Sequence, residues 1–190
     1  PAHIDSPFQF TIPETEKISN PLISLEDADL GYSEAIINNV KIAFRPGDRI
    51  GLLGVNGAGK STFVKSLKGD LQLLQGNKIE GKNLKIGYFS QHQVDDLMLD
   101  KSPIDHLAKI EKEATESEIR NFLGGFNFRG DKAKDVIKNF SGGEKARLAL
   151  AIIAFQRPNL LLMDEPTNHL DMDMRQALTV ALQDFSGAIV

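Results

Sequence analysis

The stretch Gly54-Val55-Asn56-Gly57-Ala58-Gly59-Lys60-Ser61 decides the fold, because it fits the phosphate-loop pattern G-x-x-x-x-G-K-[ST]. An apolar strand is predicted before it, over residues 49–53, and a helix is predicted after it, as far as about Lys68. The glycines let successive backbone N–H groups point at phosphate oxygens, and the helix N-terminus adds a favourable partial charge. Lys60 would reach the β- and γ-phosphates, and the Ser61 hydroxyl would bind Mg²⁺. A glycine-rich turn with a chance lysine is the weaker interpretation, since the expected strand and helix flank the motif.

A second feature is a pair of acids directly after a buried strand. Residues 160–163 are continuously apolar, as a buried parallel strand would be, and Asp164 and Glu165 follow. Asp164 would hold Mg²⁺ through water, and Glu165 would polarise the attacking water as general base. A solvated acidic turn is the alternative. It is disfavoured beside a phosphate loop, because both features belong at the carboxyl ends of parallel strands.

The chain alternates strand-like and helix-like segments, which predicts an α/β sheet domain with a helical insertion. Residues 1–21 contain four prolines and are interpreted as a linker. Because the chain ends at Val190 inside an apolar stretch, we expect it to be part of a longer protein. The expected strands lie over residues 22–28, 36–44, 49–53, 84–89, 160–163 and 188–190, and the expected helices over residues 57–68, 102–140 with breaks, 142–157 and 174–185.

The amino-acid composition excludes several classes of protein. The 190 residues are 41% apolar and 25% charged, with a net charge of −4, which suits one folded domain with a full core. The absence of cysteine excludes disulfides, thiolate metal sites and a cysteine nucleophile. The longest apolar run, residues 148–155, is far shorter than the ~20 residues that a membrane-spanning helix needs. The mildly acidic charge balance does not favour a strong polyanion binder.

A third motif is the helix start Ser141-Gly142-Gly143-Glu144, which follows Phe140. Two glycines expose the helix N-terminus without side-chain bulk, so Ser141 and the backbone amides could approach a phosphate closely. On spacing alone, an ordinary capping box is the favoured interpretation. One chain cannot easily place two phosphate cradles on one nucleotide, whereas two copies facing each other could.

Together these motifs resemble those of the ATP-binding cassette (ABC) ATPases. The resemblance covers residues 22–190 and rests on four motifs in order: the phosphate loop 54–61, Tyr88-Phe89-Ser90-Gln91 as the Q-loop, residues 139–144 as the signature and residues 160–165 as Walker B. It implies a P-loop NTPase of ABC type. Such a cassette has a mixed sheet with flanking helices, an antiparallel β-subdomain and a helical subdomain, here about residues 95–145.

Further details are similar to the ABC-F family. Residues 165–171, Glu-Pro-Thr-Asn-His-Leu-Asp, are similar to that family's hallmark stretch, and residues 141–147 are similar to its signature. Transporter cassettes usually carry Gln where Glu144 stands. The resemblance identifies residues 22–190 as the second cassette of a two-cassette protein, and residues 1–21 as the end of the linker between the cassettes.

The resemblance implies ATP and Mg²⁺ as ligands and assigns roles to residues. Tyr32 would stack on adenine, although a strand-end tyrosine at a turn is the alternative. Catalysis would depend on Glu165, Lys60 and Gln91, and Mg²⁺ would be bound by Ser61, Gln91 and Asp164. The nucleotide would be held by Tyr32, Asn56, Gly57, Ala58, Gly59, Lys60, Ser61 and Thr62. Ser141, Gly142 and Gly143 would touch the ATP of the partner cassette, and Asp171 would lie at the interface.

The sequence departs from the family pattern in two ways. Phe140 replaces the usual leucine of the signature, which is a mild apolar change. The switch histidine is absent, because the chain stops before the position where the family places it. His3, His92, His106 and His169 are in the wrong places to replace it. We therefore expect this chain alone to bind ATP and to hydrolyse it poorly.

The leading hypothesis is a cassette of a soluble, cytoplasmic ABC-F ATPase that acts on ribosomes. Its partners would be a second cassette, in the same longer chain or as a homodimer mate, and the ribosome. No direct membrane insertion is expected, and nucleic acid would be reached only through the ribosome or missing segments. The alternatives are the ATP-binding subunit of a membrane transporter, a nucleic-acid-acting ABC ATPase and a non-hydrolysing regulatory cassette.

Overall fold

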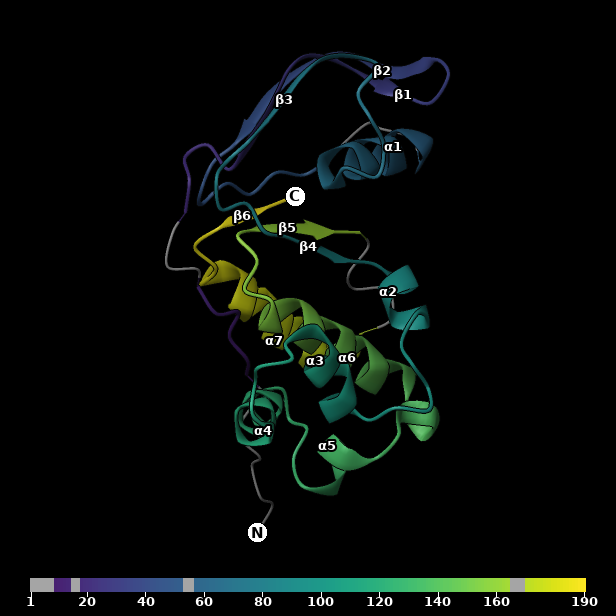
Figure 1. The fold of residues 1–190 in the computed structure, drawn as a ribbon, viewed down its shortest axis with the longest axis vertical. Helices are drawn as coiled ribbons and strands as arrows, with labels where there is room; N and C mark the ends of the chain where they lie inside the picture. Colours follow the sequence, from purple (N-terminus) through teal and green to yellow (C-terminus); the bar gives the residue numbers. More distant parts are fainter. Residues whose placement is uncertain (1–8, 15–17, 53–56, 165–169) are drawn as a thin grey trace. The chain divides into compact units, whose positions relative to one another are not determined.

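The computed structural model describes residues 9–14, 18–52, 57–164 and 170–190, which form two compact units. The sheet unit contains the described parts of residues 14–86, together with residues 158–162 and 186–190. The helical unit contains the described parts of residues 1–13 and 163–185, together with residues 87–157. Each unit is described by itself below, with the elements labelled as in Figure 1.

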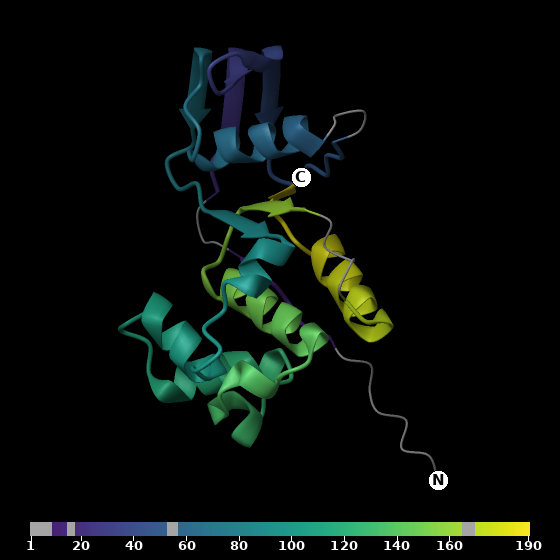
Figure 2. The same cartoon turned by 90° about the vertical axis from the view of Figure 1, so that its right-hand side faces the viewer.

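The sheet unit is built on an antiparallel sheet of order β2-β1-β3. Its strands are β1 (Ile23–Gly31), β2 (Ala35–Phe44) and β3 (Gln75–Glu80). Helix α1 (Gly57–Lys68) lies against this sheet, as Figure 2 shows. The apolar side chains of β1 are all buried, and the exposed pair Glu26 and Asp27 falls where the register with β2 shifts between Leu25 and Ala28. Phe44 meets Phe63 of α1 edge-on, with ring centroids 6.2 Å apart.

The ends of α1 and β3 depend on glycines with positive φ. Gly69 has φ +88° and follows the last residue of α1, which confirms the helix end expected there. Gly76 has φ +89° in β3, and a Cβ there would collide with the carbonyl oxygen of Asp27 on β1. The close approach of two backbones therefore requires glycine at residue 76. Strand β3 was not expected from the sequence, because its exposed, polar residues carry no apolar alternation.

The strand expected over residues 49–53 is largely wrong. Only Arg49 pairs, through an isolated parallel bridge to Ile189, and Ile50 donates a 2.9 Å backbone hydrogen bond to the same residue. Residues 50–52 are not in a strand, and residue 53 lies outside the described residues. An apolar pattern therefore does not suffice for a strand here, because the described part of this segment pairs with a neighbour at a single residue.

A second sheet has the order β4-β5-β6. Its strands are β4 (Ile86–Phe89), β5 (Leu160–Met163) and β6 (Ala188–Ile189), of which β5 and β6 run parallel. These are three of the expected strands, and their short apolar runs are typical of buried parallel strands.

The buried side chain of Asn159 organises the start of β5 within the sheet unit. Its Oδ1 accepts a 2.8 Å hydrogen bond from the Lys85 N–H, and its Nδ2 donates a 2.7 Å bond to the Asn83 carbonyl. Its backbone N–H donates to the Lys85 carbonyl, and its carbonyl accepts from the Ala188 N–H, each at 2.9 Å. Asn159 is 1% exposed, and it gives hydrogen-bond partners to backbone groups of the two chain segments that lie on either side of β5.

The helical unit is formed by helices whose apolar sides share one core. They are α2 (Gln91–Asp95), α3 (Pro103–Ile110), α4 (Glu116–Gly125), α5 (Asp131–Lys134), the 3-10 turn Ile137–Asn139, α6 (Gly142–Phe155) and α7 (Met172–Gln183). Thr115 caps α4 by accepting a 3.1 Å hydrogen bond from the Glu118 N–H, but no bond returns from the Glu118 side chain, so only half of a capping box forms. A full box is found instead at Ser102 and Asp105, at the start of α3.

An aromatic cluster joins three segments of the helical unit. Phe10 stacks on Phe126, with centroids 4.7 Å apart, and Phe122 lies 5.3 Å from Phe126. Phe122 also meets Phe155, at the end of α6, edge-on at 5.0 Å. Phe10, which precedes the first strand, thus packs on Phe126 at the end of α4, and Phe122 of α4 packs on Phe155 of α6.

We expect Asn159→Ala to lower the free energy of unfolding by roughly 2–3 kcal/mol, because it leaves the Lys85 N–H and the Asn83 carbonyl without their partners. Asn83→Ala is the matched control, since only the backbone carbonyl of Asn83 takes part, and it should stay within about 0.5 kcal/mol of the parent. Urea unfolding measures both. An equal effect of the two substitutions would contradict the role given to the Asn159 side chain.

Candidate functional site

The phosphate-loop residues that the structure describes open helix α1. Lys60 and Ser61 lie exposed in its first turns, while Thr62 is buried. Asn56 lies outside the described residues. The predicted residues Gly57, Ala58 and Gly59 form the first turn of the helix, the end that carries the positive partial charge of the helix dipole. An exposed lysine and hydroxyl beside these residues make this helix start suited to a polyphosphate.

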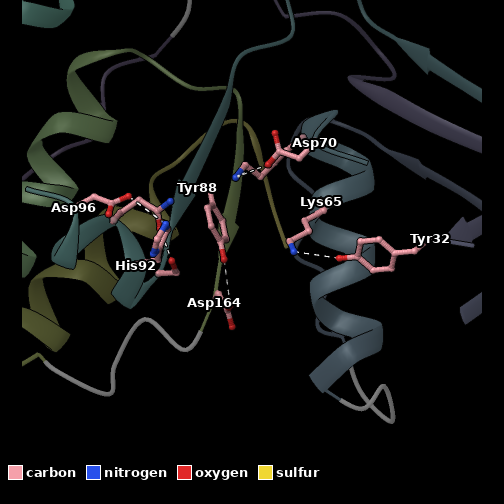
Figure 3. Close-up of polar contacts among 10 residues, drawn as sticks. Tyr32, Lys65, Asp70, Tyr88, His92, Asp96 and Asp164 are labelled. Atoms are coloured by element: carbon pink, nitrogen blue, oxygen red, sulfur yellow. Dashed lines mark hydrogen bonds and ion pairs between the residues drawn. The ribbon is translucent and has the colours of Figure 1, made fainter. Parts of the chain in front are cut away.

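Tyr32 lies beside α1 within the sheet unit. It follows β1, the residue is 54% exposed, and its hydroxyl accepts a 3.1 Å hydrogen bond from Lys65 Nζ on α1 (Figure 3). The same ammonium lies 5.8 Å from the ring centroid. Gly31 allows this turn, because a Cβ there would collide with the Glu34 carbonyl oxygen. Tyr32 is thus held by α1 with much of its surface open, as stacking on a base would require.

Asp164 follows β5 and belongs to the helical unit. Its backbone N–H donates to the Phe89 carbonyl at 2.9 Å, and its Oδ2 accepts a 3.2 Å hydrogen bond from the Tyr88 hydroxyl (Figure 3). The carboxylate is exposed and held in place by two residues of β4. Glu165 lies outside the described residues. The Tyr88 contact was not predicted, although its signal was available: both residues belong to motifs at the ends of expected strands.

Gln91 is the first residue of α2 and is exposed. Its Nε2 donates a 2.8 Å hydrogen bond to Asp95 Oδ1, one turn further along the helix. The amide nitrogen is therefore used within α2. The amide oxygen is the atom whose chemistry suits Mg²⁺.

The signature region forms a complete capping box at the start of α6. The Ser141 hydroxyl accepts from the Glu144 N–H at 3.1 Å, and Glu144 Oε1 accepts from the Ser141 N–H at 3.2 Å. Gly142 is exposed and Gly143 half-buried. The capping box and the exposed, glycine-lined helix start are thus present together, so the two interpretations of the sequence do not exclude each other.

Charged neighbours surround this helix start. Lys132 Nζ lies 2.6 Å from Glu144 Oε2. Partial burial alone would raise the pKa of Glu144, but hydrogen bonds from Lys132 and Ser141 outweigh it and leave the pKa below its ordinary value. Burial lowers the pKa of Arg147, against the opposing effect of Glu144 and Asp171. The Lys132 contact was not predicted, because the two residues lie on different elements with no shared periodicity.

Asp171 is the N-cap of α7 and lies near the signature. Its Oδ1 accepts a 2.8 Å hydrogen bond from the Met174 N–H, and its Oδ2 would be 3.7 Å from a Cβ placed on Gly143. Arg175 Nε donates to the Leu170 carbonyl at 3.0 Å. The capping role explains this aspartate locally, while its place at a cassette interface stays a prediction.

The two described histidines have structural roles. His106 is buried, with Nδ1 2.7 Å from the Ser102 carbonyl, while Nε2 accepts a 3.0 Å hydrogen bond from the Met98 N–H. His92 is exposed and lies 3.2 Å from Asp96 (Figure 3). His3 and His169 lie outside the described residues.

The structure therefore brings predicted residues together in three places. Tyr32 joins α1 in the sheet unit, whereas the end of β5 and the signature belong to the helical unit. Among the described residues no group of three or more histidine or acidic side chains forms a metal cluster. The predicted Mg²⁺ ligands nonetheless have the right chemistry, because Ser61, Gln91 and Asp164 all offer oxygen donors.

Comparison with known proteins shows the family. The model of the ABC transporter family matches residues 37–168, which is more than half of the chain. The chain belongs to this family of ATP-binding cassettes and is an ATPase domain of ABC type.

The curated relatives support the sub-family indicated by the motifs. The chain is 54% identical over 191 residues to the ATP-binding protein YheS of Escherichia coli K12, covering all of this chain and 30% of that protein. It is 36% identical to GCN20 of Saccharomyces cerevisiae, covering all of this chain and 26% of that protein. It is 40% identical to ATP-binding cassette sub-family F member 3 of Mus musculus, over 92% of this chain and 25% of that protein. The chain thus spans less than a third of the length of these relatives.

Solved structures confirm the fold. An ATP-binding protein from Pyrococcus furiosus is similar with a TM-score of 0.71 and 19% identity, covering 88% of each chain. CbiO1 of Clostridium perfringens, part of the ABC transporter complex CbiONQ, is similar with a TM-score of 0.67 and 20% identity, over 88% of this chain and 76% of that one. In the part of the chain described, no helix is long and apolar enough to cross a membrane.

We expect Glu144→Gln to lower the free energy of unfolding by about 1 kcal/mol at pH 7, because it removes the charged half of the capping box. Since the pKa of Glu144 is lowered on folding, the stabilisation from its charged form is full above the ordinary pKa of 4.5 and disappears as the pH falls through the lower folded pKa. The difference in unfolding free energy between parent and variant should therefore shrink as the pH is lowered from about 5 to about 3.

Urea unfolding of parent and variant across this pH range measures the effect. The control at pH 7 is Glu118→Gln at the corresponding position of α4, where only the Thr115 half of the box forms, and it should change the unfolding free energy little. A Glu144→Gln deficit that stayed constant down to pH 3 would contradict the assignment.

Proposed function

We propose that this chain is the second cassette of a cytoplasmic ABC-F protein that binds and hydrolyses Mg-ATP together with another cassette and acts on ribosomes. Residues 22–190 form the cassette, with its helical subdomain at about residues 95–145, and residues 1–21 end the linker that joins two cassettes. The observation that carries the proposal is the 54% identity with the ATP-binding protein YheS, which extends over the whole of this chain.

The nucleotide would be bound at two different helix starts. The start of α1, with Lys60, Ser61 and the neighbouring backbone N–H groups, would hold the phosphates, and Tyr32 would stack on the adenine. In the closed pair, Ser141 and Gly143 would meet the γ-phosphate of the ATP held by the other cassette. Only ATP links both halves in this way, so its hydrolysis would reopen the pair.

Mg²⁺ fits the oxygen donors of Ser61, Gln91 and Asp164. When bound, it supplies positive charge that stabilises the transferring phosphoryl group. Tyr88 orients the Asp164 carboxylate through its hydroxyl. Lys60 would position the β- and γ-phosphates, and Glu165 would take the proton from the attacking water.

The ribosome proposal is tested first on the full-length parent protein. Glu165→Gln, combined with the same change in the other cassette, should hold ATP without turnover. This variant should sediment with ribosomes in ATP and remain in the supernatant without nucleotide. If ATP still binds and no sedimentation occurs, the ribosome role is wrong, and a transporter or nucleic-acid partner becomes the next target.

We expect Gly143→Ala to preserve folding and to impair ATP turnover. A Cβ at Gly143 would meet Asp171 Oδ2 at an ordinary 3.7 Å, so the methyl group fits the folded chain. In the proposed pair it would separate the helix start from the γ-phosphate. ATP hydrolysis by the full-length protein should fall at least about tenfold, since small misplacements at a reacting centre cost one to two orders of magnitude.

The matched control is Gly124→Ala in α4, where a Cβ would meet nothing within 4 Å. Both substitutions should leave the unfolding free energy equal or raise it by up to ~1 kcal/mol, because alanine favours helix more than glycine. Only Gly143→Ala should lower hydrolysis. Equal hydrolysis by the two variants would contradict the close contact proposed for Gly143.

A further inference from the structure

The signature helix begins beside a cluster of cations and aromatic rings in the helical unit. Lys132 Nζ of α5 lies 4.7 Å from the ring centroid of Phe140, and Phe140 stacks on Phe128 with centroids 6.1 Å apart and an interplanar angle of 9°. Arg147 Cζ lies 4.6 Å from the Phe128 centroid. Both rings are buried, and each has a cation near it, Lys132 beside Phe140 and Arg147 beside Phe128.

Lys132 also forms an ion pair with Glu144, the carboxylate of the capping box. Its ammonium is 2.6 Å from Glu144 Oε2, while Oε1 of the same carboxylate holds the Ser141 N–H. The Glu144 side chain is 24% exposed, so the ion pair is partly shielded from water. Glu144 is therefore fixed from two sides, by the backbone that precedes α6 and by a lysine of α5.

A carboxylate in this position opposes the function proposed for the helix start. Glu144 is the third residue of α6, directly after Gly142 and Gly143, and it would repel the γ-phosphate that these residues are proposed to meet. Glutamine, which transporter cassettes usually carry here, would bring no such charge. An opposite charge in direct contact with Glu144 removes most of the repulsion, and Lys132 provides it.

Phe140 makes this arrangement possible. Its ring face gives Lys132 a second favourable contact, which leucine, the usual residue at this signature position, cannot offer. Lys132, Phe140 and Glu144 thus depend on one another, because the ring places the ammonium and the ammonium neutralises the carboxylate.

We propose that Lys132 is a positioning residue of the nucleotide site, which neutralises Glu144 and holds the capping box so that Ser141 and Gly143 can receive the γ-phosphate of ATP bound by the other cassette. This inference rests on the proposed function. It assigns a role to a residue outside the known cassette motifs of this chain. Lys132 acts through Glu144 and not by touching the nucleotide.

The test uses the full-length protein with Glu165 and its counterpart changed to Gln, and it measures release of N-methylanthraniloyl-labelled ATP and ADP after rapid mixing with unlabelled nucleotide. ADP is the internal control, because it has no γ-phosphate to meet the signature. Lys132→Met should speed ATP release about tenfold, the scale of one lost charge pair at a binding site, and leave ADP release within about twofold. Lys134→Met, an exposed lysine two residues along α5, should release both nucleotides like the parent.

Rescue separates charge neutralisation from direct contact and from a structural defect. In the double variant Lys132→Met/Glu144→Gln no carboxylate is left to neutralise, so ATP release should return to the rate of Glu144→Gln alone. Lys132→Arg, which keeps the charge, should release ATP like the parent. The proposal is overturned if the double variant stays as fast as Lys132→Met, if Lys132→Met speeds ADP and ATP release equally, or if it changes neither.

Failure of the proposed function gives a different result. If the parent itself releases ATP as fast as ADP, no γ-phosphate-dependent closure exists, and both proposals fall together. If the parent retains ATP longer than ADP and Lys132→Met does the same, only the role of Lys132 is wrong.

Discussion

The buried side chain of Asn159 is the constraint on which the second sheet depends. A buried amide must find hydrogen-bond partners for its donors and its acceptor. The side chain of Asn159 finds them in the backbone of residues 83 and 85, just before β4, and its backbone carbonyl accepts a further bond from β6. Apolar side chains alone fix the register of a strand weakly, because a shift along the sheet puts one leucine in the place of another with little change in free energy. One amide that fits in a single register fixes β5, and with it Asp164, five residues further along the chain.

The sequence was most informative where one local rule determines the structure. Gly69 ends α1 because only glycine easily adopts its φ, and Ser141 begins α6 because its hydroxyl satisfies a free backbone N–H. The sequence was least informative at β3, where Gly76 fits because a neighbouring backbone approaches it and no apolar alternation marks the strand. The strand expected at residues 49–53 failed for the opposite reason, because an apolar pattern is present but, in the described part of the segment, only Arg49 bridges to a partner strand.

The motifs of the candidate site could be located from spacing, but their side-chain partners could not. Tyr88 and Asp164 are 76 residues apart, and Tyr32 and Lys65 are 33 apart, so no periodicity within one element connects them. Each pair forms because two elements end or pass next to each other in the fold. The same holds for Lys132, whose position in a four-residue helix looks unremarkable until Glu144 and Phe140 are placed beside it. Such partners belong to tertiary packing, which a motif does not encode.

The aromatic composition of the chain has a spectroscopic consequence. Its 190 residues contain no tryptophan and two tyrosines, Tyr32 and Tyr88. The Tyr32 hydroxyl accepts a hydrogen bond from Lys65 of α1, the helix that carries the phosphate-loop residues. The Tyr88 hydroxyl donates a hydrogen bond to Asp164. The tyrosine emission of this chain therefore comes from two rings, one beside α1 in the sheet unit and the other in β4 beside Asp164 in the helical unit. Unlabelled protein therefore carries an intrinsic fluorophore at each of these positions, and a change in its tyrosine emission reports a change around one or both rings.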